Sequence, residues 1–152
     1  MKTLSHLVAS GEVSMVDVSA KPALRRQAIA HGEIQLQPAT IALIESHAVA
    51  KGNVLATARL AGIQAAKRTS ELIPLCHPLP LAYCAIQFDW PDARDRICIT
   101  ATVKTVAQTG VEMEALTAVS AAALTIYDMC KAVDTSMKIT EIRLLSKTKI
   151  KA

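Results

Sequence analysis

The chain has 152 residues and a formal charge of +4, and 51% of it is hydrophobic although only 3% is aromatic. This length predicts one domain, residues 1–152, with a core of aliphatic side chains. The small positive excess suits an anionic small molecule. Because no aromatic residues are interleaved with the basic ones, the composition does not indicate nucleic-acid binding. We find no secretory signal and no apolar run of about 18 residues, so we expect a cytoplasmic protein with no membrane partner.

Periodicity in the first half of the chain predicts a strand followed by two helices. Residues 28–36 alternate in hydrophobicity like a strand, and Pro38 opens a helix that runs to about residue 46. A turn over 50–53 contains Gly52, and helical spacing then continues from 54 to about 72. The alanine-rich helices bury little area each, so we expect a homo-oligomer that buries more between its subunits.

The second half predicts a hairpin, a long helix and a final strand. Three prolines in 73–80 exclude regular structure there. Residues 81–89 and 96–104 then form an antiparallel hairpin. An alanine-rich helix is predicted within 110–134, followed by a strand over 140–147. The resulting order, β–α–α–β–β–α–β, predicts an α+β sandwich with one antiparallel sheet and the helices on one face.

The long helix carries ionisable residues that an apolar helix normally lacks. Asp128 and Lys131 are three positions apart and therefore share a face. They form either a salt bridge at a solvated helix edge or a pair held where proton exchange is useful. Glu112 and Glu114 favour the helix dipole in the first turn, and one of them could instead accept N–H donors from a guanine-like ring. Since their side chains point about 200° apart, we expect only one to face a ligand.

Other charged or nucleophilic residues allow two interpretations each. Lys51 precedes Gly52 before a helix and is either a solvated turn lysine or part of an anion site. His77 is fixed between prolines in PLCHPLP, where it either faces a ligand or bonds a carbonyl. Basic side chains are spread over four segments and either are solvated surface or converge on a polyphosphate: Lys21, Arg25, Arg26, Lys67, Arg68, Lys147 and Lys149.

The cysteines indicate neither disulfides nor a metal centre. Cys76, Cys84, Cys98 and Cys130 form no C-x-x-C pair, and we expect reduced core residues. A zinc site at Cys76 and His77 is discounted, because the two are adjacent and a second spaced ligand pair is missing. The sequence also lacks GxxxxGK[ST], GxGxxG, HExxH and GxSxG, so we expect no cofactor and no metal.

Three stretches resemble the cyclic pyranopterin monophosphate synthase family, the molybdenum cofactor biosynthesis protein C. They are MVDVSAKP (15–22), KGNVLATARLAGIQAAKRTSELIPLCHPLPL (51–81) and KTVAQTGVEMEALTAVSAAALTIYDMCKAVD (104–134). The resemblance implies a ferredoxin-like fold and a homohexamer, a trimer of dimers with active sites at subunit interfaces. It also implies a lyase of molybdenum cofactor (molybdopterin) biosynthesis. That lyase converts 3′,8-cyclo-7,8-dihydroguanosine 5′-triphosphate to cyclic pyranopterin monophosphate and releases pyrophosphate.

The resemblance also assigns roles by motif. The acid–base residues would be Lys51 of KGNV and Asp128 and Lys131 of YDMCKA. The substrate would contact Leu75, Cys76 and His77 of IPLCHP, Glu112, Met113 and Glu114 of GVEMEA, and Arg26, Lys67 and Lys147 as phosphate ligands. In a water-poor interface, desolvation and neighbouring cations would lower the pKa of one lysine, which then acts as a base.

The chain departs from the family pattern in a few places. Asn53 stands where the family usually has Asp, Ser70 and Glu71 where it often has Trp-Asp, and TKIKA follows Lys147 where many members have a Gly-rich loop and a strand. The alternative to an enzyme is a non-catalytic oligomer that binds a nucleotide-like or polyanionic ligand. In that case Asp128–Lys131 is a structural ion pair and His77 is a core histidine.

Overall fold

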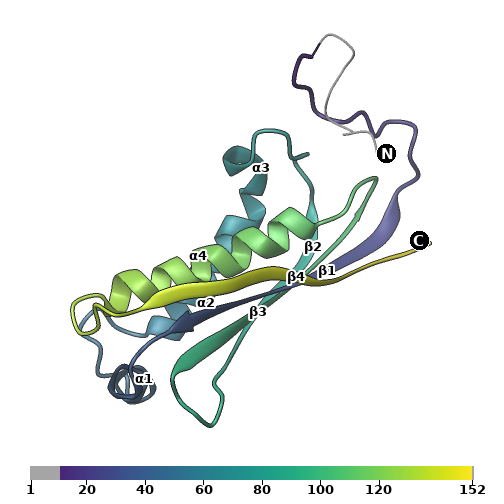
Figure 1. Ribbon diagram of the computed structural model, residues 1–152. Helices are drawn as coiled ribbons and strands as arrows, with labels where there is room; N and C mark the ends of the chain where they lie inside the picture. The colour runs from purple at the N-terminus through teal and green to yellow at the C-terminus, as the bar shows by residue number, and fades with distance from the viewer. Residues whose placement is uncertain (1–10, 152) are drawn as a thin grey trace.

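The computed structural model describes residues 11–151 and contains one four-stranded antiparallel sheet (Figure 1). Its strands are β1 (Leu24–Gln35), β2 (Leu81–Asp89), β3 (Arg96–Ala107) and β4 (Lys138–Ile150). The helices are α1 (Pro38–Glu45), α2 (Val54–Lys67), α3 (Thr69–Leu72) and α4 (Glu112–Cys130). The spatial order β2-β3-β1-β4, with every neighbouring pair antiparallel, is the ferredoxin-like arrangement, so the predicted α+β sandwich is confirmed.

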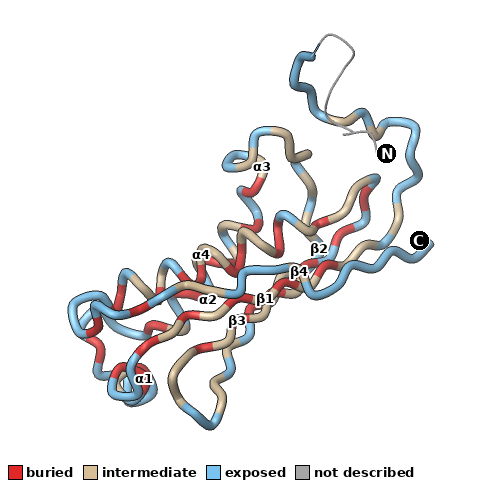
Figure 2. The backbone as a smooth tube through the Cα atoms, in the orientation of Figure 1, coloured by how far each residue is buried: buried red, intermediate tan, exposed pale blue. Residues whose placement is uncertain are grey.

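The core lies between the sheet and the helices α2 and α4, whose inner faces are buried (Figure 2). Alternate residues of β1 point into this core, including Ala30, Gly32 and Ile34. A Cβ atom on Gly32 would collide with Val119 of α4, so glycine lets the helix approach the sheet closely. The remaining residues of β1 therefore point to the opposite, helix-free face of the sheet.

Small residues also bring α2 and α4 together. Along α2 the buried positions are Val54, Ala58, Gly62 and Ala66, one residue per turn. A Cβ atom on Gly62 would lie 2.9 Å from the carbonyl oxygen of Ala118 in α4. The two helices thus contact each other nearly backbone to backbone, and their relative position is fixed by steric fit.

The predicted elements are present, but several boundaries differ. Strands β1 and β4 are longer than expected because they pair along their whole length, from Arg25 opposite Ile150 to Gln35 opposite Lys138. The helix predicted over 54–72 is divided into α2 and α3. The Thr69 hydroxyl donates to the carbonyls of two residues in the last turn of α2, which favours ending the helix there.

The long helix ends at Cys130 rather than near residue 134, because the chain turns inward to bury Asp134. The Asp134 carboxylate accepts hydrogen bonds from the backbone N–H of Gln37 (2.8 Å), the Thr40 hydroxyl (3.1 Å) and Ser136. Burial alone would raise the pKa of Asp134, but these hydrogen bonds outweigh it and the pKa lies below its usual value. Asp134 thereby fixes the start of α1 to the turn after α4.

The cysteines do not share one environment. Cys130 is buried in the core. Cys84 is partly buried and packs against the same core. The prediction of core cysteines is wrong for the other two, because Cys76 lines a surface cavity and Cys98 lies on the helix-free face of the sheet. Within residues 11–151, no helix is both long and apolar enough to cross a membrane.

Candidate functional site

The predicted acid–base residues form one cluster at the C-terminal end of α4. The Asp128 carboxylate accepts hydrogen bonds from Lys51 Nζ at 2.8 Å and from Lys131 Nζ at 2.7 Å. Lys51 also donates to the Asp128 carbonyl oxygen at 2.8 Å, which anchors the turn before α2 to the end of α4. Helix spacing predicted that Asp128 and Lys131 are neighbours, and the family resemblance grouped Lys51 with them. The structure shows that Lys51 contacts Asp128 from a segment 77 residues away.

This cluster, Lys51–Asp128–Lys131, is an exposed ion-pair network in the single chain. The side chains of Asp128 and Lys131 are each 57% exposed, and that of Lys51 is 46% exposed. Hydrogen bonds from Lys131 and Lys51, together with their charges, lower the pKa of Asp128 to about 2. The same contacts raise the pKa of Lys131. The single chain therefore does not provide the water-poor interface in which we expected one lysine to have a lowered pKa.

Most of the predicted substrate-binding residues line a cavity at the opposite end of α4. It has a volume of about 450 Å³ and lies between the start of α4, the proline-rich loop 73–80 and the segment before β1. Its lining includes six residues that the sequence assigned to substrate: Leu75, Cys76, His77, Glu112, Met113 and Glu114. Both carboxylates line the cavity, whereas we expected only one of them to face a ligand.

The polar groups of this cavity are held in different ways. His77 Nε2 lies 2.8 Å from the carbonyl oxygen of Val16, so this ring bonds a carbonyl and also borders the cavity. Glu114 is 4% exposed, and burial raises its pKa, with a smaller contribution from the charge of Glu112. Burial also raises the pKa of the Cys76 thiol, and Glu114 adds to this effect. Burial therefore opposes ionisation of both Glu114 and Cys76.

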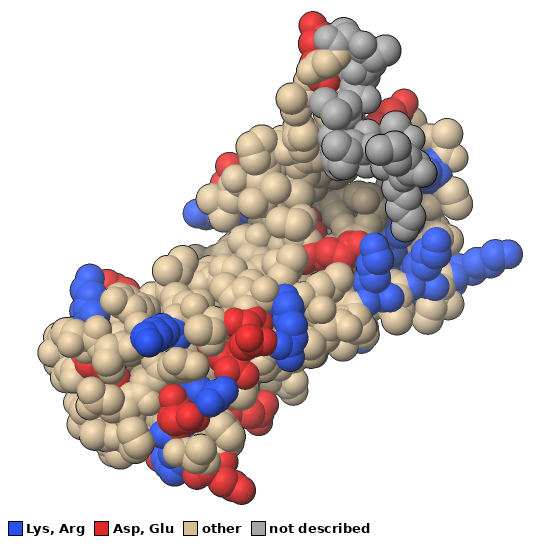
Figure 3. Space-filling model, in the orientation of Figure 1, with Lys and Arg blue, Asp and Glu red and all other residues tan. Residues whose placement is uncertain are grey.

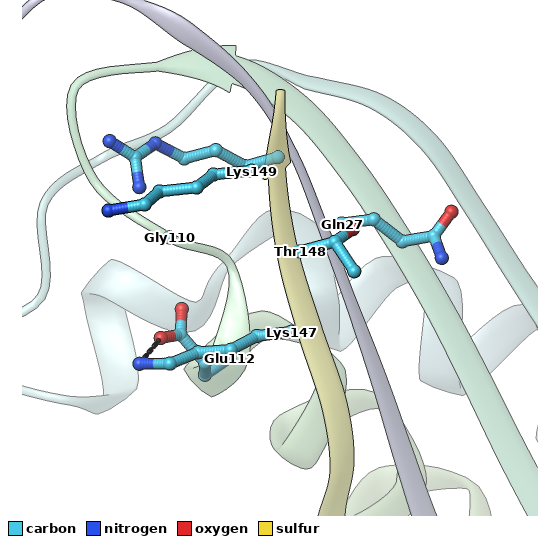
Figure 4. A pocket seen from close by; sticks show the side chains of 7 residues that line it. Gln27, Gly110, Glu112, Lys147, Thr148 and Lys149 are labelled. Atoms are coloured by element: carbon cyan, nitrogen blue, oxygen red, sulfur yellow. Dashed lines mark hydrogen bonds and ion pairs between the residues drawn. The ribbon is translucent and has the colours of Figure 1, made fainter. Parts of the chain in front are cut away.

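A smaller, basic pocket of about 190 Å³ adjoins the cavity and shares Gly110 and Glu112 with it. Lys147 reaches from β4 to Glu112, with 2.9 Å between Nζ and Oε1, and Lys149 projects from further along the same strand toward the same side (Figure 4). Burial opposes ionisation of Glu112, but the hydrogen bond and charge of Lys147 outweigh it and lower the pKa of Glu112. Figure 3 shows basic side chains gathered at this end of the sheet beside carboxylates.

Two of the three predicted phosphate ligands belong to this basic pocket, and one does not. Arg26 lines it and is oriented by hydrogen bonds to the carbonyls of Ala107 (2.9 Å) and Gln108 (2.8 Å). Lys147 lines it as well. Lys67, at the end of α2, is exposed and lines neither cavity.

Sequence reasoning missed several residues that border these cavities. Thr109 and Gly110 precede α4, and Val16 and Val18 line the larger cavity from the N-terminal side, next to Lys21, which was recognised only as one of the scattered basic residues. These residues lie within or next to the motifs MVDVSAKP and TGVEMEA, so motif position was the signal available for them. Lys149 was recognised only as one of many scattered basic residues, because β4 pairing alone decides which end of the sheet it reaches.

One chain does not bring the two groups of residues together. From Glu114 to Asp128, α4 advances by fourteen positions, about 21 Å at the rise of an α-helix. Glu114 lines the larger cavity, whereas Asp128 belongs to the cluster at the other end of the helix. A ligand in the cavity is therefore beyond the reach of Lys51 and Lys131 of the same chain.

Known proteins resemble this chain over nearly its whole length. A family model described as the MoaC family matches residues 15–149. A cyclic pyranopterin monophosphate synthase of Chloroflexus aggregans is 59% identical over 144 residues, which cover 95% of this chain and 87% of the relative. Synthases of the same name from Roseiflexus sp. and Nostoc sp. are 55% and 57% identical, covering 97% and 95% of this chain and 94% and 86% of the relatives. On the extent of these matches, the chain belongs to the MoaC family.

Proposed function

We propose that this chain is a cyclic pyranopterin monophosphate synthase, a lyase of molybdenum cofactor biosynthesis. Its substrate is 3′,8-cyclo-7,8-dihydroguanosine 5′-triphosphate, and its second product is pyrophosphate. The observation that carries the proposal is the high identity to several synthases along the chain. The cavity of about 450 Å³ supports it, because this volume is typical of small-molecule sites.

The two adjoining cavities suit the two ends of this substrate. The larger cavity takes the guanine-derived ring, with Glu114 placed to accept hydrogen bonds from paired N–H donors. The basic pocket takes the triphosphate, where Arg26, Lys147 and Lys149 supply positive charge. Glu112 borders both spaces and is ion-paired to Lys147, so it sets the boundary between the ring and the phosphates.

The reaction needs several proton transfers, because the purine ring is opened and rebuilt as a pterin. Lys51, Asp128 and Lys131 are the groups that can divide this work. The cyclic phosphate closes when a hydroxyl derived from the ribose attacks the α-phosphorus. The bond from that phosphorus to the bridging oxygen then breaks, and pyrophosphate leaves. Basic side chains stabilise the negative charge of the leaving group.

In this proposal, the cluster Lys51–Asp128–Lys131 of each active site comes from a second copy of the chain. The separation of about 21 Å along α4 supports this. We therefore infer active sites at subunit interfaces, in a cytoplasmic homohexamer built as a trimer of dimers. Covering the exposed cluster with a neighbouring subunit would remove water from it, and desolvation then favours a neutral lysine. The proton-transfer role of the cluster thus depends on assembly.

The test is turnover of the cyclic dihydro-GTP intermediate, followed by pyrophosphate release and by the fluorescent oxidised pterin. Wild type should form product, whereas Lys51→Ala and Lys131→Ala should form none while keeping the oligomer. Lys138→Ala is the matched control and should remain active. It removes an exposed lysine at the first position of β4, at the opposite end of the strand from Lys147. If a well-folded wild-type oligomer gives no product, the enzyme proposal fails. The alternative is then the non-catalytic oligomer that binds a nucleotide-like or polyanionic ligand.

A further inference from the structure

Three metal-ligating side chains meet on the helix-free face of the sheet. His31 and Glu33 are two positions apart in β1 and therefore share this face. Cys98 of β3 is the register partner of Glu33, so its side chain lies beside that carboxylate. One ring nitrogen, one carboxylate oxygen and the sulfur atom all lie within 4.8 Å of one another. Each side chain is partly buried, and those of His31 and Glu33 are 14% exposed.

The spacing of these atoms fits a tetrahedral ion. His31 Nε2 lies 3.4 Å from Glu33 Oε1. Two such ligands, each about 2.0–2.1 Å from Zn²⁺, are roughly 3.3 Å apart in a tetrahedral site. A thiolate bonded at about 2.3 Å lies roughly 3.6 Å from each of them. In the structure the three ligand atoms lie within 4.8 Å of one another. Rotation of the Cys98 side chain can shorten the distances from its sulfur atom to the roughly 3.6 Å of a zinc site.

Neighbouring groups orient the Glu33 carboxylate and leave one oxygen available. Arg96 Nη1 donates to Glu33 Oε2 at 2.9 Å, while Oε1 faces His31. Hydrogen bonds of this kind commonly fix the carboxylate ligands of metal sites. The other two guanidinium nitrogens of Arg96, Nε and Nη2, donate to Asp95 at 2.9 and 3.0 Å, so Asp95 balances much of the positive charge of Arg96.

A buried hydroxyl beside the cluster lacks a partner among the described residues. Thr140 of β4 is the register partner of Glu33 on the side opposite Cys98, and its Oγ1 makes no hydrogen bond. Buried hydroxyls are rarely left unpaired, and bound water is a usual partner. Water held by an ion would supply that partner. Arg143, which pairs with His31 in register, is itself ion-paired to Glu141.

We propose that His31, Glu33 and Cys98 bind one Zn²⁺ ion, with water in the fourth position. Imidazole, carboxylate and thiolate are all zinc ligands, and the carboxylate and thiolate together neutralise the charge of the ion. The ion would link β1 to β3. None of its three ligands lines the larger cavity or belongs to the cluster Lys51–Asp128–Lys131. The proposed Zn²⁺ site can therefore be tested independently of the proposed reaction.

The test is metal binding by the full chain after treatment with a chelator and a thiol reductant. Dialysis against buffered Zn²⁺ should load about one ion per chain, and Co²⁺ should give a sulfur-to-cobalt charge-transfer band. Cys98→Ser and His31→Gln should each weaken Zn²⁺ binding at least about tenfold. Cys84→Ser is the matched control, because it removes a partly buried cysteine from the neighbouring strand β2. Its affinity for Zn²⁺ should equal that of wild type.

Several results would overturn the proposal. One is a wild-type chain that retains no Zn²⁺, and another is a Co²⁺ complex without the sulfur band. Both measurements need no variant, so a folding defect of Cys98→Ser does not obscure them. Zn²⁺ binding that survives Cys98→Ser but is lost in Cys76→Ser would place the ion at the larger cavity and would equally refute the site.

Discussion

Lys51→Ala and His77→Ala, each of which we expect to be inactive alone, should restore turnover when they assemble together. Lys51 belongs to the exposed cluster at the C-terminal end of α4, whereas His77 lines the cavity at the other end. The fourteen positions from Glu114 to Asp128 correspond to about 21 Å. A lysine side chain reaches only about 6 Å from its Cα atom, so no local movement within one chain closes this distance. We therefore expect each active site to combine the cavity of one subunit with the cluster of another.

The amount of recovery follows from counting the intact combinations. If equal amounts of the two variants mix at random, each site takes its cluster and its cavity from different subunits. Each half is intact with a probability of one half, so about a quarter of the sites are fully intact. Turnover per chain should thus rise from background to about 25% of the wild-type value.

The assay is pyrophosphate release by oligomers that carry a different affinity tag on each variant, so that mixed species can be isolated. The matched control mixes Lys51→Ala with Lys131→Ala. Both substitutions affect the same cluster, and no intact cluster can form in that mixture. Isolated mixed oligomers of Lys51→Ala and His77→Ala that stay inactive would refute the reasoning, as would equal recovery in the control mixture.

Two further predictions concern the fold that positions the site. Gly62→Ala should lower the free energy of unfolding by about 1–3 kcal/mol, because its methyl group would meet the Ala118 carbonyl. Urea denaturation measures this change in the free energy of unfolding. Alanine is more favourable than glycine at an open helix position, so a stabilised Gly62→Ala variant would contradict the close contact of α2 with α4. Asp134→Asn should cost about 1–3 kcal/mol, since buried donors lose their carboxylate. Because folding lowers the pKa of Asp134, its contribution is present above its unfolded pKa of 3.8 and disappears as the pH falls through the folded value. Asp134→Asn should therefore flatten the acid limb of a stability–pH curve, and an unchanged acid limb would contradict the assignment.

The sequence by itself determined the elements and the faces they present. The alternation around Ala30 and Ile34 defined a strand with one buried face, and the prolines of 73–80 defined an irregular loop. The order of the elements then led to an α+β sandwich with one antiparallel sheet. These features depend on interactions within a few residues, which periodicity and the special geometry of proline encode directly.

Only the tertiary structure decided which of those residues meet. Lys51 reaches Asp128 across 77 positions, and Cys98 joins His31 and Glu33 because β3 pairs with β1 in one particular register. The structure also showed the cluster Lys51–Asp128–Lys131 to be exposed and distant from the cavity, which spacing on a helix could not reveal. Such contacts arise from packing and strand register over the whole chain. No local pattern specifies them, because many long-range pairings are compatible with the same helices and strands.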